Sequence, residues 1–201
     1  MTTAISVFAI KLMLLVVDPT PLFFMGDSKV YIDAAVYHNI PWSRSFTYGW
    51  LNRLFAVWPG TLQPLVVSQV LASALTAWLL ALSLLRFFAV RPSVVIVASI
   101  LFAVDPLQLI HERLILTETF TLLLLAGNLL AAFRYLQYPG LLSLFLVCLT
   151  GILIVSLRLV YIPVVLSEAL LLPLLGWVNG SSRDCRIVGD NVYCTSVQRC
   201  S

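Results

Sequence analysis

Long apolar runs alternate with short polar breaks along most of the chain. A helix needs roughly 20 apolar residues to cross the hydrocarbon core of a membrane, where every backbone polar group must be satisfied internally. The pattern therefore predicts an all-α integral membrane protein, a multispanning bundle of about six transmembrane helices. The apolar runs cover residues 4–17, 65–88, 93–104, 120–133, 141–157 and 159–178.

The first apolar run is short and contains Lys11, and Pro19 and Pro21 follow it. A cleaved signal peptide would have basic residues before the apolar core and a small-residue cleavage site after it. The sequence has neither feature in a convincing form. We therefore favour a first helix that is retained in the protein.

Composition supports a membrane protein and excludes one class of partner. Hydrophobic residues make up 61% of the chain and charged residues 10%, and the mean hydropathy is +1.01. A water-soluble domain does not need such a composition. The net charge of +3 is dispersed, and no block of Lys and Arg residues occurs. A nucleic-acid partner is therefore not expected.

The chain divides into a transmembrane domain, residues 1–178, and a polar tail, residues 179–201. The tail contains Cys185, Cys194 and Cys200, whose spacing matches no zinc-binding pattern. Whether these cysteines can form a disulfide depends on the side of the membrane on which the tail lies.

A polar stretch after the first run, residues 26–63, is the candidate active-site loop. Asp27, Tyr31, Ala34 and His38 recur at helical spacing, which predicts a short helix along the membrane surface. Asp27 is either a functional carboxylate or the N-cap of this helix. Aromatic residues typical of a membrane interface also occur here, namely Trp42, Tyr48, Trp50 and Trp58.

A second polar cluster covers residues 111–119 and follows Asp105-Pro106, which predicts a broken helix. His111 and Glu118 share a helical face and could hold a divalent cation, but two ligands without a third are a weak indication. An ion pair of Glu112 with Arg113, or of Glu118 with an arginine, is the commoner arrangement.

Two further polar residues fall in the last apolar runs. Arg158 marks either a tight turn between two helices or the break in one re-entrant element. Glu168 is expected to be an interhelical partner.

The loop charges predict an orientation. Placing Arg86, Arg91 and Arg134 in the cytoplasm puts both polar clusters outside. The external arginines then suggest contacts with anionic ligands or carboxylates. Six spans put the tail in the cytoplasm, whereas a cleaved first segment or a re-entrant span puts it outside. The external arginines are Arg44, Arg53, Arg113 and Arg158.

The order of these motifs resembles that of bacterial GT-C glycosyltransferases of the protein O-mannosyltransferase and aminoarabinose-transferase type. The similarity extends over residues 18–175. It is carried by Gly26-Asp27-Ser28 with Tyr31, by the run from Arg44 to Gly49, by Glu112-Arg113 and by Thr117-Glu118.

The resemblance implies transfer of a sugar from a polyprenyl-phosphate carrier to an acceptor, at the external face of the bacterial cytoplasmic membrane. It implies that Asp27 is the catalytic base and Glu118 a second catalytic residue. A base is needed because the acceptor hydroxyl loses a proton, and a cation stabilises the phosphate that leaves. The implied substrate-binding residues are Tyr31, Arg44, Tyr48, Arg53, Glu112, Arg113 and Arg158.

Alternatives remain at this point. Members of this family usually continue through further spans, so the chain is a compact variant, one half of a two-protein enzyme or an inactive fragment. A non-catalytic protein that binds or scaffolds lipid-linked intermediates is the main alternative function. A small transporter using Asp105 and Glu168 is disfavoured, because the polar residues gather at one face rather than at the midplane.

Overall fold

The computed structural model describes residues 2–24, 26–40, 45–88, 90–138, 140–183, 185–188 and 191–194. The chain is helical up to Arg183, as the apolar runs predict. The first part contains α1 (Thr2–Val17), α2 (Asp27–Tyr37), α3 (Phe46–Asn52), the π-helix η1 (Arg53–Val57) and α4 (Gln63–Phe87). The second part contains α5 (Pro92–Val104), α6 (Pro106–Arg113), α7 (Glu118–Gln137), α8 (Leu141–Leu157), the short 3-10 helix η2 (Leu159–Tyr161) and α9 (Ile162–Arg183).

Several of these helices are long and apolar enough to cross a membrane. Within the described residues three pass this test, and the bent pair α5 and α6 makes a possible fourth. Two further apolar helices, α1 and α8, are shorter. The apolar helices indicate a membrane protein.

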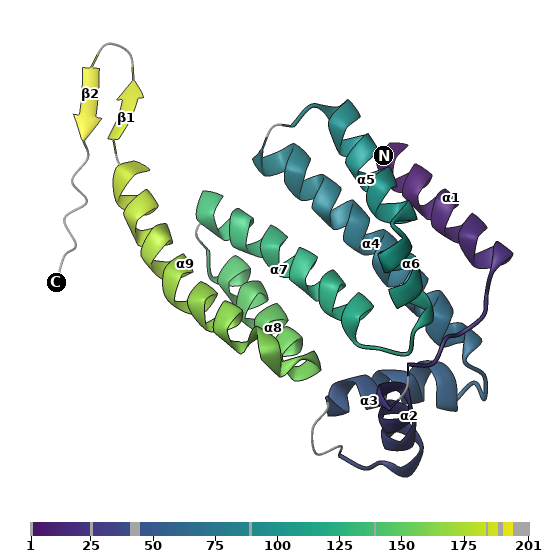
Figure 1. Cartoon of the computed structure of the whole chain (residues 1–201). Helices are drawn as coiled ribbons and strands as arrows, with labels where there is room; N and C mark the ends of the chain where they lie inside the picture. The colour runs from purple at the N-terminus through teal and green to yellow at the C-terminus, as the bar shows by residue number, and fades with distance from the viewer. Residues whose placement is uncertain are drawn as a thin grey trace.

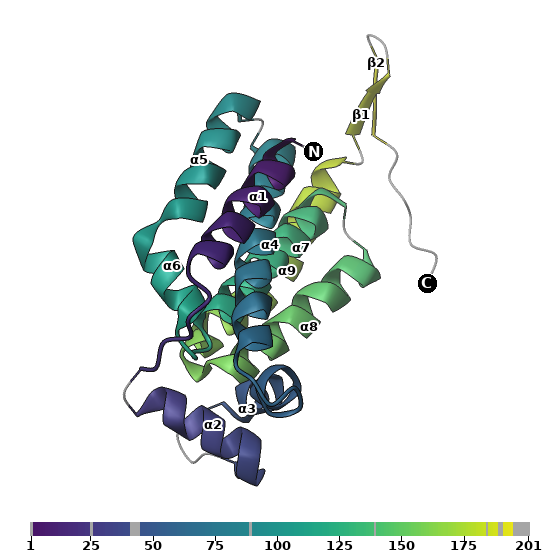
Figure 2. The same cartoon turned by 90° about the vertical axis from the view of Figure 1, so that its right-hand side faces the viewer.

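The long helices run side by side, and α2 and α3 lie across one end of them (Figure 1). The start of α1 and the end of α9 lie at the other end, and the view turned by 90° agrees (Figure 2). Helix α4 packs against α1, α5 and α7, and α7 also packs against α8. We call the end that carries α2 and α3 the α2–α3 end.

Local sequence explains where α5 and α6 begin and end. Pro92 and Pro106 lie in the first turns of the two helices, where a missing N–H breaks no helical hydrogen bond. Asp105 caps α6, and its Oδ2 accepts a hydrogen bond from the backbone N–H of Gln108 at 3.2 Å. The two helices bend by 49°. The prediction of a broken helix at Asp105-Pro106 is confirmed.

The α2–α3 end has its own hydrophobic core. Tyr31 from α2 and Tyr48 from α3 pack there with Leu65 at the start of α4. Ile115 and Leu157 complete this core from the segments that precede α7 and end α8. This core thus joins side chains from five different parts of the chain and packs the surface helices onto the bundle.

The polar tail contains a feature that we did not predict. Strand β1 (Cys185–Val188) pairs antiparallel with β2 (Asn191–Cys194). In this register Cys185 lies opposite Cys194, whereas Cys200 is outside the described residues.

Candidate functional site

The two polar segments of the sequence meet at the α2–α3 end. The backbone N–H of Leu22 donates to the carbonyl of Arg113 at 2.8 Å, and the N–H of Ile115 donates back to Leu22 at 3.3 Å. The hydroxyl of Ser28, in the first turn of α2, donates to the carbonyl of Ile115 at 3.2 Å. The segment before α2 and the segment before α7 are thus joined by main-chain contacts.

Two predicted site residues, Tyr31 and Tyr48, form the floor of this region. Their rings meet edge to face with centroids 4.8 Å apart, and both side chains are buried. The Nε2 group of Gln69 donates to the Tyr48 hydroxyl at 3.1 Å and to the carbonyl of Leu114 at 2.9 Å. Burial raises the pKa of Tyr48 well above its ordinary value, and Tyr31 and Glu118 add to the shift. Tyr48 is therefore a neutral anchor at neutral pH.

Glu118 and Arg158 form an ion pair beside these rings. Glu118 is the first residue of α7, where the positive end of the helix favours a carboxylate. Its Oε1 lies 2.6 Å from Nη2 of Arg158, the residue that ends α8. The expectation that Glu118 pairs with an arginine is confirmed, and Arg158 lies in a turn between two helices rather than inside one element.

Both side chains of this ion pair have polar atoms that can still bind a ligand. The Glu118 side chain is 18% exposed and that of Arg158 is 40% exposed. Among the described residues, no group donates a hydrogen bond to the buried Oε2 of Glu118. A half-exposed guanidinium with further N–H donors can bind an anion, because its planar fork matches phosphate and carboxylate oxygens.

Asp27 begins α2 one helical turn before Tyr31, on the same face of the helix. The N-cap of α2 is Gly26 and not Asp27, so the alternative interpretation of Asp27 as the cap is wrong. Gly26 has φ +85°, a conformation that L side chains rarely adopt. The Asp27 carboxylate is partly exposed in the first turn, where it is near the positive end of the helix.

The predicted polar stripe on α2 ends earlier than expected. His38 adopts a left-handed conformation with φ 59° and terminates the helix. Its exposed ring contacts the guanidinium of Arg53, a predicted substrate-binding residue. Arg53 thus lies at the far end of α2 from Asp27. Arg44, another predicted ligand of the donor, is outside the described residues.

Glu112 and Arg113 serve the packing of α6 against α1. The carboxylate of Glu112 is buried and pairs with Nζ of Lys11, which is also buried, and not with Arg113 as expected. Nη2 of Arg113 donates to the carbonyl of Leu14 at 3.0 Å, and the Arg113 side chain is buried too. Both side chains thus make their contacts with α1.

Sequence reasoning missed the partners of these residues. Lys11 interrupts an apolar run but lies within α1, and its charge meets Glu112 inside the protein. Gln69 is an isolated amide in the apolar run of α4, and Asn52 is a buried amide at the end of α3. For Lys11 and Gln69 the available signal was a polar residue within an otherwise apolar stretch, whereas Asn52 lies in the polar stretch and gave no such signal.

No group of three or more metal-binding side chains occurs within the part of the chain that the structure describes. His111 and Glu118, the pair considered for a cation, therefore have no third ligand of these types among the described residues. The structure brings together Tyr31, Tyr48, Glu118 and Arg158, with Asp27 on the same helix as Tyr31.

No protein-family model, curated protein or solved structure matches the chain.

Proposed function

We propose that this protein is a membrane glycosyltransferase that moves a sugar from a polyprenyl-phosphate carrier to an acceptor at the α2–α3 end. The observation that carries the proposal is the ion pair of Glu118 and Arg158, in which the guanidinium is 40% exposed and Oε2 of Glu118 has no donor among the described residues. It lies against the tyrosine floor that α2, the helix of Asp27, helps to build. A carboxylate and a guanidinium near a membrane surface are the groups that this reaction requires.

The reaction assigns a role to each group. The acceptor hydroxyl oxygen attacks the anomeric carbon and forms the new C–O bond, while its proton passes to Asp27. The bond from that carbon to the phosphate oxygen breaks, and the electron pair leaves with the polyprenyl phosphate. Arg158 binds this anion, and Glu118 holds the guanidinium in place.

The proposal includes an arrangement in the membrane. Six apolar helical passages, α1, α4, the bent pair α5 and α6, α7, α8 and α9, alternate in direction. The α2–α3 end then faces the outside of the bacterial cytoplasmic membrane, where the lipid-linked donor is exposed. The sides of the bundle are apolar, as contact with lipid requires.

The donor site is tested by mass spectrometry of lipids that purify with the protein. Wild type is compared with Arg158→Ala and with Arg86→Ala, a matched loss of an arginine at the opposite end, in the last turn of α4. We expect a polyprenyl phosphate or its sugar conjugate with the wild type and Arg86→Ala, and its loss with Arg158→Ala. Bulk phospholipid alone in all three preparations would count against the proposal.

The base is tested by sugar transfer in membranes supplied with lipid-linked donor. Asp27→Asn keeps the side-chain shape but cannot accept the proton, so transfer should fall by at least about 100-fold. Asp33→Asn changes a second carboxylate of α2 and serves as the control, with activity near that of the wild type. If Asp27→Asn transfers sugar as fast as Asp33→Asn and the wild type, Asp27 is not the catalytic base.

A second candidate function is a non-catalytic protein that binds lipid-linked intermediates. It is favoured by the position of Asp27 in the first turn of α2, where a carboxylate stabilises the helix without any chemistry. It is also favoured by the structural use of Glu112 and Arg113. In this case Asp27→Asn lowers the melting temperature, and the bound lipid still depends on Arg158.

A further inference from the structure

A pocket of about 370 Å³ lies between α2, η1 and the start of α4. Its floor is formed by buried residues, among them Ala35, Ala56 and Leu65. Its mouth lies at Val36 and Val57, whose side chains are 47% and 37% exposed. The walls are almost entirely apolar, so the pocket favours a hydrocarbon group.

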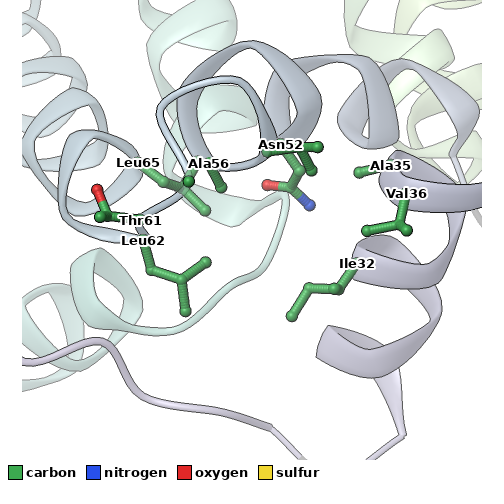
Figure 3. Close-up of a pocket in the computed structure, with 10 residues that line it drawn as sticks. Ile32, Ala35, Val36, Asn52, Ala56, Thr61, Leu62 and Leu65 are labelled. Carbon is green, nitrogen blue, oxygen red and sulfur yellow. The ribbon is translucent and has the colours of Figure 1, made fainter.

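Two polar side chains line this apolar pocket, of which Thr61 is exposed and Asn52 is buried. Asn52 is only 1% exposed, and neither its Oδ1 nor its Nδ2 has a hydrogen-bond partner among the described residues. Figure 3 shows its carboxamide facing the space between Ile32 and Leu62. A buried amide without partners is unfavourable, and native proteins contain few of them. A ligand that both donates and accepts a hydrogen bond would supply the partners that this amide lacks.

The backbone around Asn52 is also unusual. Helix α3 ends at Asn52 and continues as the π-helix η1, in which the N–H of Trp58 donates to the carbonyl of Arg53 at 3.0 Å. Short π-helical turns are rare and are frequent at functional sites. This widened turn forms one side of the pocket.

We propose that the pocket binds a membrane-derived amphiphile with an alkyl chain and a hydroxyl group. The alkyl chain fills the apolar walls, and the hydroxyl donates to Oδ1 and accepts from Nδ2 of Asn52. Trp50 and Trp58 are exposed on the same segment, as side chains at a membrane–water interface are. This site is separate from the Glu118–Arg158 pair and does not depend on sugar transfer.

The test is photolabelling of the full chain in lipid nanodiscs with two probes. One probe is a diazirine derivative of 1-octanol, and the other is the same diazirine derivative of octane. Labelled residues are mapped by mass spectrometry, and labelling of the pocket is normalised to labelling of the exposed Ile152 on α8. Each probe is applied to the wild type, Asn52→Leu and Asn39→Leu, in which an exposed asparagine outside this pocket is replaced.

We expect the alcohol to label the wild-type pocket about fivefold more than the alkane, the factor that one hydrogen bond supplies. Asn52→Leu should abolish this preference and leave labelling by the alkane unchanged, and Asn39→Leu should keep the preference. Val36→Trp at the mouth should reduce labelling by both probes, which gives a test that does not change Asn52. Three results would overturn the proposal: equal labelling by both probes, no labelling of the pocket, or a preference for the alcohol that survives Asn52→Leu. Water would then be the hydrogen-bond partner of the amide.

Discussion

Buried polar side chains join helices that are far apart in the sequence. In each contact, one side chain meets a partner from another helix inside a largely apolar bundle. Their burial makes each contact expensive to break, because a group left alone cannot recover its hydration. The contacts are those of Lys11 with Glu112, of Gln69 with Tyr48 and of Asn128 with Glu168.

The Lys11–Glu112 pair leads to a prediction on stability. Lys11→Met leaves the carboxylate of Glu112 buried without its partner, so the free energy of unfolding should fall by about 3–5 kcal/mol. Unfolding by denaturant in mixed micelles measures this change. The double variant Lys11→Met/Glu112→Leu should recover most of the loss, since an apolar pair needs no compensation. A double variant as unstable as Lys11→Met alone would contradict this explanation.

Tyr48 leads to a prediction on pH. Its folded-state pKa is raised above the ordinary value of 10.0, so the folded protein holds this proton more tightly than the unfolded chain does. Its contribution to stability is complete below pH 10 and is lost as the pH rises toward the folded-state pKa. Melting temperatures from pH 8 to 11 should therefore fall less in Tyr48→Phe than in the wild type. Tyr138→Phe, at an exposed position, should follow the wild type.

At the residue scale, the sequence indicated that some charged side chains would have a partner in another helix. Pairing of Glu118 with an arginine and a partner for Glu168 were both predicted, and both are present. The partner of Lys11 lies 101 residues away, and only the packing of α1 against α6 brings the two together. No local pattern contains that information.

Helices α2 and α3 approach each other closely through one glycine. A Cβ atom added at Gly49 would lie 3.2 Å from the Cβ of Ala34, closer than ordinary contact. This close approach holds Tyr31 against Tyr48 and so supports the candidate site.

Gly49→Val should separate the two helices and lower the free energy of unfolding by about 1–3 kcal/mol. Gly127→Val is the matched control, because a Cβ atom added at that position of α7 meets nothing within 4 Å. Its effect should stay within about 0.5 kcal/mol. Thermal unfolding in detergent compares the two variants, and equal losses would show that the α2–α3 contact is not the cause.

Elements with a local signal were predicted and those without one were not. The break at Asp105-Pro106 and the helix that begins at Asp27 follow from proline and from helical spacing. The left-handed conformation of His38 ends that helix at Tyr37, so His38, the last residue of the expected stripe, lies outside the helix. The π-helix η1 and the hairpin of β1 and β2 follow from packing and strand pairing that the sequence pattern does not show.

The two ends of the molecule carry different elements. The start of α1 and the end of α9 lie at one end, and α2 and α3 lie at the other (Figure 1). Within the described residues, three helices, or four with the bent pair, are long enough to span a membrane by themselves, so six passages remain a proposal.

The proposed arrangement predicts labelling of single cysteines from opposite sides. In a variant without native cysteines, Lys29→Cys and Thr61→Cys should react with an impermeant maleimide from one side of the membrane. Arg91→Cys should react only from the other side, because it lies between the far ends of α4 and α5. All three positions are exposed, so each should react readily. Labelling of Lys29→Cys and Arg91→Cys from the same side would rule out the alternating passages.

The pairing of Lys11 with Glu112 also bears on how the chain is made. The ribosome adds about 5–20 residues per second, so Glu112 is synthesised roughly 5–20 s after Lys11. During this interval α1 carries an uncompensated lysine, which costs about 2.5–3.5 kcal/mol at the centre of a membrane. In the proposed arrangement, α1 therefore settles in the membrane only after α6 has been made, and a nascent chain arrested before Glu112 should hold α1 poorly in lipid.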